Sequence, residues 1–150
     1  MRVVIQRVKY AEVIIDGKEK KHSGRGLMIL LGIENADEIN DVQWLVNKIL
    51  NLRIFNDKKG VMNQSLLDIK GELMIISQFT LMAKTKKGNR PSYIRAACHE
   101  HAIPLYNSFI EYSQKFLSKP VVSGKFGSDM QIELINDGPV TIWIDSKNRE

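Results

Sequence analysis

The sequence opens with a long stretch rich in β-branched residues, and this pattern predicts a strand over residues 2–15. Asp16-Gly17 then predicts a hairpin turn. The uninterrupted apolar run from Leu27 to Ile33 predicts a buried strand. Shorter apolar segments between turn residues predict further strands at 53–55, 72–81, 120–125, 129–136 and 140–145. Strands therefore outnumber helices among the predicted elements.

Two regions have helical periodicity instead. Apolar residues recur every three or four positions from Ile39 to Ile49, behind a capping-box spacing of Asn35 and Glu38. Further helical material is predicted to reach about Leu117, with Pro104 in the first turn of a second helix there, where a missing N–H is tolerated. Several neighbouring strands are joined by turns too short for a crossover. We therefore expect an α/β fold: a mixed, antiparallel-rich, twisted and barrel-like sheet packed by two main helices.

The length of 150 residues predicts a single domain over 1–150, with residues 146–150 as a loose polar tail. The one cysteine, Cys98, excludes an intramolecular disulfide and suits a reducing compartment. The first residues lack the apolar stretch of a signal peptide, and no apolar run reaches the ~20 residues of a membrane span. These features predict a cytoplasmic protein with no membrane partner.

The net charge of +5 is compatible either with simple solubility or with a polyanionic partner. The position of the charges favours the second interpretation. Four cations gather within a loop that also contains glycine and proline, namely Lys84, Lys86, Lys87 and Arg90. We expect this exposed loop to contact an RNA backbone.

The usual catalytic sets are missing from the sequence: it has no Gly-rich phosphate loop and no nucleophile elbow. His99 and His101 are two residues apart, so their rings would point away from each other on a helix, and we expect solvated side chains rather than a metal site. Two polar interruptions of apolar strands remain: Ser77-Gln-Phe-Thr-Leu81 and Asn136-Asp-Gly-Pro-Val-Thr141. Each is compatible with a local turn or with a functional site at a strand end.

These two segments resemble the signature motifs of the D-aminoacyl-tRNA deacylases. The resemblance extends over nearly the whole chain and includes Gln6-Arg7-Val8, Arg53-Ile-Phe55, Gly88-Asn-Arg-Pro-Ser92 and Met130. It implies hydrolysis of the ester between a D-amino acid and the 3′-terminal adenosine of tRNA. Because selection in the family works by rejecting L side chains, glycyl-tRNA, whose amino acid is achiral, would also be accepted. One departure is Lys84, where many members of the family carry an acidic residue.

The resemblance also implies roles for individual residues. The catalytic segment would comprise Ser77, Gln78, Phe79 and Thr80. Gly138-Pro139 would be a cis dipeptide that excludes L side chains, held in orientation by Arg7, and it would act in the partner subunit of a homodimer. Phe126 and Met130 match positions that line the pocket for the terminal adenine. No metal and no organic cofactor is implied.

The chemistry leaves two routes open. Thr80 would be the nucleophile in one, although its motif contains no histidine or carboxylate to act as base. In the other, which we favour, backbone N–H groups near Phe79 and Thr80 bind the oxyanion while the tRNA 2′-hydroxyl assists water. A non-catalytic RNA-binding module and a general esterase are alternative functions. Catalytic turnover of the ester would exclude the RNA-binding module. A rate that depends on the RNA portion of the substrate would exclude the general esterase.

Overall fold

The central element of the protein is the strand β1 (Arg2–Ile15), which is paired along both of its edges in the computed structural model of residues 1–150. Its antiparallel neighbours on one edge are β2 (Glu19–Ser23) and β3 (Gly26–Gly32). The other edge pairs with β8 (Met130–Asp145) over nearly the whole of β1. These pairings confirm the long strand, the hairpin and the buried apolar strand that the sequence predicted.

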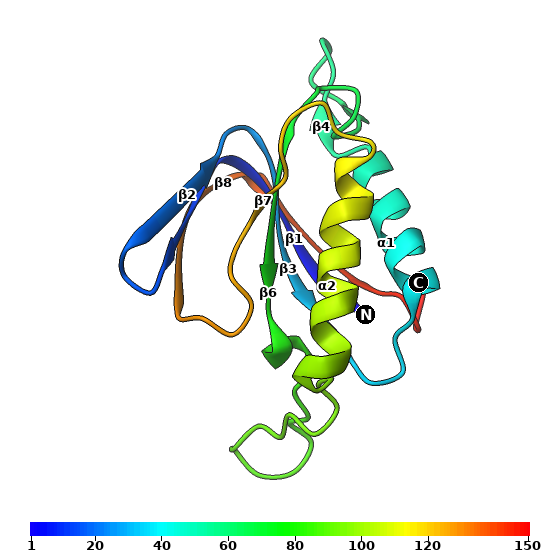
Figure 1. Cartoon of the computed structure of the whole chain (residues 1–150). Helices are drawn as coiled ribbons and strands as arrows, with labels where there is room; N and C mark the ends of the chain where they lie inside the picture. Colours follow the sequence, from blue (N-terminus) through cyan, green and yellow to red (C-terminus); the bar gives the residue numbers. More distant parts are fainter.

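The remaining strands add a parallel half to the sheet. β6 (Glu72–Ser77) runs parallel to β3, and the short β7 (Val122–Ser123) runs parallel to β6. A separate ribbon is formed by β4 (Phe55–Asn56) and β5 (Met62–Gln64). The six-stranded sheet curls strongly, so that β2 and the start of β8 stand apart from the helices, whereas the end of β8 runs back toward α1 (Figure 1). The mixed, antiparallel-rich and barrel-like sheet is therefore confirmed.

Two helices, α1 (Ile39–Asn51) and α2 (His99–Gln114), lie side by side along the sheet (Figure 1). α1 buries an apolar stripe that includes Val42, Leu45 and Ile49, as its periodicity predicted. Tyr106 and Phe109 of α2 are buried in the same core. Burial raises the pKa of the Tyr106 hydroxyl, which donates a hydrogen bond of 2.9 Å to the Ile75 carbonyl of β6. The helix layer is thus bonded directly to the strand that carries Ser77.

The helix boundaries differ from the predicted ones. The N-cap of α1 is Glu38, which forms a capping box with Asp41, so Asn35 lies outside the helix. Pro104 lies inside the single helix α2 instead of in the first turn of a second helix. Neighbouring buried residues of α2, Ala102 and Tyr106, pack into the core on both sides of the proline, and this packing holds the helix together across the missing N–H.

Two strand predictions were also wrong. The strand predicted over 72–81 ends at Ser77, and Phe79–Met82 forms the 3₁₀ helix η1. The strands predicted at 129–136 and 140–145 are a single strand, β8, which continues through Gly138-Pro139 with register shifts opposite Gln6–Tyr10. The segment Asn136–Thr141, which was compatible with a local turn, is therefore an irregularity within a long strand.

The polar C-terminal segment is packed rather than loose. Ser146 is buried, and its hydroxyl accepts a 2.7 Å hydrogen bond from the Met1 α-amino group and donates one of 2.7 Å to Asp41. Lys147 also binds Asp41, and this bond raises the pKa of the lysine. The Arg149 guanidinium lies 4.1 Å from the centre of the Trp44 ring. Hydrogen bonds and a cation–π contact thus hold the segment against α1.

Neither α1 nor α2 has the length and apolar character that a membrane span requires.

We predict that Tyr106→Phe lowers the free energy of unfolding by about 1 kcal/mol, because the hydroxyl makes a buried hydrogen bond to β6. Urea denaturation at one protein concentration measures the change. Tyr112→Phe is the matched control, since Tyr112 is only partly buried and its hydroxyl makes no hydrogen bond within the chain. Equal stability of the two variants would show that the Tyr106 bond contributes nothing to stability.

Candidate active site

The candidate site begins where β6 ends at Ser77 and the chain turns into η1. The Gln78 backbone has left the strand conformation, yet its N–H still donates to a β3 carbonyl at 2.7 Å. The Gln78 side-chain amide donates to Thr80 Oγ1 at 2.5 Å. Beyond the 3₁₀ turn, the Arg2 guanidinium donates to the Leu81 carbonyl at 3.1 Å. The segment Ser77–Leu81 is therefore held at both of its ends.

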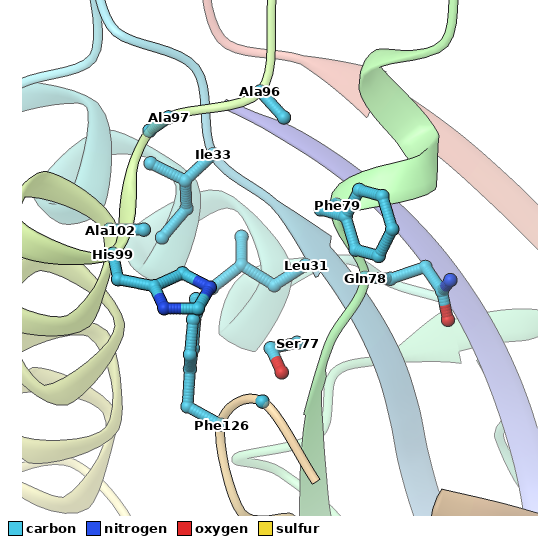
Figure 2. Close-up of a pocket in the computed structure, with 11 residues that line it drawn as sticks. Leu31, Ile33, Ser77, Gln78, Phe79, Ala96, Ala97, His99, Ala102 and Phe126 are labelled. Carbon is cyan, nitrogen blue, oxygen red and sulfur yellow. The ribbon is translucent and has the colours of Figure 1, made fainter. Parts of the chain in front are cut away.

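A pocket of about 330 Å³ opens beside this segment, between β3, the strand end and the start of α2 (Figure 2). Its walls are mostly apolar, and the only polar side chains that line it are those of Ser77, Gln78 and His99. The volume and lining are typical of a small-ligand site. The lining residues are Leu31, Ile33, Ser77, Gln78, Phe79, Ala96, Ala97, His99, Ala102, Phe126 and Gly127.

An ion pair fixes the alanine wall of this pocket. Two nitrogens of the Arg95 guanidinium donate to one oxygen of the largely buried Glu34 carboxylate, at 2.6 and 3.0 Å. Ala96 forms a β-bridge with Glu34, and the Ala97 N–H donates to the Ile33 carbonyl at 3.0 Å. This short stretch before α2 is thereby attached to the end of β3.

A second, smaller pocket of about 240 Å³ adjoins the first at the strand end. It shares Ser77, Gln78, Phe79 and Gly127 with the first pocket. Phe126 lines the first pocket and Met130 lines the second, so the two residues that the resemblance assigned to adenine binding flank the same strand end.

The segment Ser77–Thr80 offers backbone donors and no general base. Phe79 and Thr80 begin a 3₁₀ helix, so their N–H groups have no partner in the preceding turn, and neither donates to another part of the chain. The Thr80 hydroxyl is hydrogen-bonded to Gln78, with no imidazole or carboxylate bonded to it. This arrangement can stabilise an oxyanion, but it does not activate a threonine nucleophile.

Gly138-Pro139 lies elsewhere on the chain. The peptide bond between the two residues is cis, as the resemblance implied, and both residues are exposed. Arg7, which is largely buried, donates through Nε to the Asp137 carbonyl at 2.8 Å and through its guanidinium to the Ile54 carbonyl. Arg7 thus anchors the residue directly before the dipeptide, while neither glycine nor proline lines either pocket at Ser77.

The strand register explains this separation. Ser77 is level with Leu31 of β3, and Leu31 is level with Val3 of β1. Gly138, by contrast, lies on β8 near the level of Arg7. The two motifs are therefore roughly 13 Å apart along the strands and three strand spacings, roughly 14 Å, apart across the sheet. Within one chain the structure does not bring them together.

The basic loop directly follows the segment Ser77–Leu81 in the chain. Its two ends are paired, with the Lys84 and Ser92 backbones exchanging hydrogen bonds of 2.8 and 3.0 Å. All four of its cations are exposed, and none forms an ion pair within the chain: Lys84, Lys86, Lys87 and Arg90. The loop extends beyond the end of the sheet that carries η1 (Figure 1).

Sequence reasoning missed one side chain of the pocket. The spacing of His99 and His101 correctly indicated that the two rings diverge: His101 Nε2 is 3.0 Å from the Asp37 carbonyl oxygen, whereas His99 lines the pocket. His99 is exposed, as expected, but it is exposed at the candidate pocket. His99 is the first residue of α2, and only the tertiary fold brings that end of the helix beside Ser77.

Comparisons with known proteins agree with this geometry. A model of the family described as D-Tyr-tRNA(Tyr) deacylase matches residues 4–145. Two D-aminoacyl-tRNA deacylases, from Azobacteroides pseudotrichonymphae and Parabacteroides distasonis, are 61% and 57% identical to the chain over the full length of both partners.

Two solved structures share the fold. The structure titled "c-Myc DNA Unwinding Element Binding Protein" has a TM-score of 0.91 and 41% identity, with 97% of this chain and 98% of that chain covered. A probable eukaryotic D-amino acid tRNA deacylase has a TM-score of 0.82 over 95% of this chain and 97% of its own, and at 19% identity it supports the fold alone. The family match and the full-length relatives show that the chain belongs to the D-Tyr-tRNA(Tyr) deacylase family and is a D-aminoacyl-tRNA deacylase, a hydrolase of the aminoacyl-tRNA ester bond.

Proposed function

We propose that this deacylase selects D-aminoacyl esters, and glycyl esters, because Gly138-Pro139 of a second copy of the chain closes the site beside Ser77–Thr80 and excludes L side chains. The observation that carries the proposal is the separation of the two motifs within one chain. Gly138 and Pro139 are exposed and line neither pocket of their own chain. A dimer in which each copy supplies the other's dipeptide would complete two sites at once.

The strand β8 is suited to such an interface. It pairs with β1 along one edge, and its other edge has no partner strand over 16 residues. Ile135 and Trp143 on this strand are large apolar residues that are 56% and 47% exposed. A long edge strand with exposed apolar side chains favours association with another surface. The Gly138-Pro139 dipeptide lies on the same strand, between these two residues.

A filter made of backbone atoms does not need to contact the side chain of the D-amino acid, so it can accept D-amino acids with different side chains. Carbonyls of Gly138 and Pro139 would occupy the space that an L side chain requires, whereas a D side chain would point away from them. Glycine has no side chain on either side and would pass. Arg7 supports this role, because its guanidinium bonds the Asp137 carbonyl next to the dipeptide.

In the proposed reaction, water adds to the ester carbonyl while the backbone N–H groups of Phe79 and Thr80 stabilise the oxyanion. The terminal 2′-hydroxyl of the tRNA assists removal of the proton from water. Collapse of the tetrahedral intermediate breaks the bond to the 3′-oxygen, which takes up a proton and leaves as the free tRNA end. The exposed cations at 84–90 would bind phosphates of the acceptor end. We place the reaction in the cytoplasm and assign no metal or cofactor to it.

Matched D-tyrosyl-tRNA and L-tyrosyl-tRNA test the central claim. With enzyme at catalytic concentration and chelator present, we expect the D ester to be hydrolysed at least about 100-fold faster than the L ester. Acid-precipitable radiolabel measures both rates. Hydrolysis of both esters at similar rates would exclude a chiral filter at Gly138-Pro139, and survival of both would exclude deacylase activity on this substrate.

Thr80→Ala separates the two chemical routes. If the 2′-hydroxyl assists water, we expect the variant to retain activity within about threefold, because Thr80 contributes its backbone N–H and not its hydroxyl. Substrate ending in 2′-deoxyadenosine should then react on the order of 100-fold more slowly, or slower still. Single-turnover kinetics measure both effects. Complete loss of activity in Thr80→Ala, with the deoxy substrate unaffected, would instead identify the hydroxyl as nucleophile.

A subunit-mixing experiment tests whether the filter acts across the dimer. Arg7→Met removes the anchor of Asp137, and we expect the D/L rate ratio to fall about tenfold or more. Ala96→Trp fills the pocket and should be inactive alone. Mixed dimers of the two variants contain one intact pocket, and discrimination should return there if the intact filter comes from the other subunit.

Arg53→Met is the matched control for this experiment, because Arg53 is an exposed arginine whose Nε also donates to a backbone carbonyl. Its rate ratio should equal that of the unaltered enzyme. Mixed dimers that hydrolyse L esters as readily as Arg7→Met alone would show that each filter serves its own subunit.

A further inference from the structure

His99 is the one polar side chain that α2 and the segment before it contribute to the pocket. The other lining residues from this part of the chain are Ala96, Ala97 and Ala102. Figure 2 shows the imidazole projecting from the start of α2 into the pocket, on the side opposite Gln78. Any polar group of a ligand that faces this wall therefore has only His99 as a side-chain partner.

The imidazole is free to bind a ligand. Its ring is exposed and makes no hydrogen bond within the chain, unlike the ring of His101, which is 3.0 Å from the Asp37 carbonyl oxygen. The Gln78 amide nitrogen, by contrast, is already engaged with Thr80. His99 thus keeps its hydrogen-bonding capacity available, as does the Ser77 hydroxyl on the strand side of the pocket.

Aromatic packing defines the direction of the ring. The His99 and Phe126 rings are 5.5 Å apart at 87°, an edge-to-face contact. Phe126 is braced in turn by the buried Tyr106, 5.8 Å away at 61°. The imidazole is therefore supported from the core, and its orientation does not depend on a flexible side chain.

The chemistry of the substrate indicates what this pocket binds. The D-amino acid side chain varies in size and polarity, so it does not suit a small pocket with apolar walls. The terminal adenosine is the same in every substrate, and its base is flat and aromatic. The base presents neighbouring donor and acceptor groups at one edge, and a neutral imidazole has one donor and one acceptor nitrogen.

Resting on the proposed function for the location of the ester, we infer that His99 is a substrate-binding residue that hydrogen-bonds the adenine base of the tRNA 3′ end. It touches the base and not the ester, so it contributes to affinity and to selection of adenine over pyrimidines. The prediction is a change in KM with little change in kcat.

Adenosine 5′-monophosphate provides a probe that requires no turnover. The chain has three histidines, so proton NMR should resolve three imidazole signals. The signal that is missing in His99→Phe is that of His99. We expect the nucleotide to shift the His99 signal and to leave those of His22 and His101 in place. Cytidine 5′-monophosphate, which carries the same ribose and phosphate, should shift the His99 signal much less. An unmoved His99 signal, or equal shifts with both nucleotides, would overturn recognition of the base.

His99→Phe keeps an aromatic ring against Phe126 and removes both nitrogens. We expect it to weaken binding of adenosine 5′-monophosphate and to raise KM for D-tyrosyl-tRNA, each about three- to tenfold, with kcat within about twofold. His22→Ala alters an exposed histidine on β2 and should change neither value. Unchanged affinity and KM in His99→Phe would refute the inference. Failure of the unaltered enzyme to hydrolyse the ester would refute the proposed function instead, since the nucleotide titration decides the role of His99 independently.

Discussion

The arrangement of this protein depends on the pairing of β1 along both of its edges. One edge holds β2 and β3, and through β3 it positions β6 and the segment Ser77–Thr80. The opposite edge holds β8 and Gly138-Pro139. Because backbone hydrogen bonds on both edges fix the registers, the two motifs cannot approach each other without dismantling the sheet. The proposed exchange of dipeptides between two copies is a direct consequence of this constraint.

Charged groups are placed where they hold backbone atoms. Arg7 bonds the Asp137 and Ile54 carbonyls, and Arg2 joins the Leu81 carbonyl to the carboxylate of Asp145. Each guanidinium thus fixes backbone beside one motif. A buried or half-buried cation that bonds carbonyl oxygens recovers part of its desolvation cost and holds those carbonyls in place. This is the property that a filter and an oxyanion site made of backbone atoms need.

Much of the fold could be predicted from the sequence because local pattern and tertiary environment agree there. The alternation in β1, the apolar run of β3 and the periodicity of α1 each describe an element that is stabilised by the core it faces. Predictions were wrong where tertiary contacts override local preference. Pairing with β1 carries β8 straight through Gly138-Pro139, and core packing carries α2 through Pro104. Neither contact is visible in the residues themselves.

The candidate site likewise combines features that the sequence indicated with features that only the tertiary fold creates. Its two motifs were identified by resemblance, whereas His99 carries no local signal, because its position at the pocket results from α2 packing beside the end of β6. The pocket contains no carboxylate, and its one imidazole lies across the cavity from the strand end. A site of this composition can bind a base and polarise a carbonyl, but it has no side chain placed to remove a proton beside Thr80. On the proposed mechanism the substrate supplies that function itself. The reaction rate therefore depends on an intact ribose at the tRNA end, whereas the discrimination between D and L esters depends on the protein backbone.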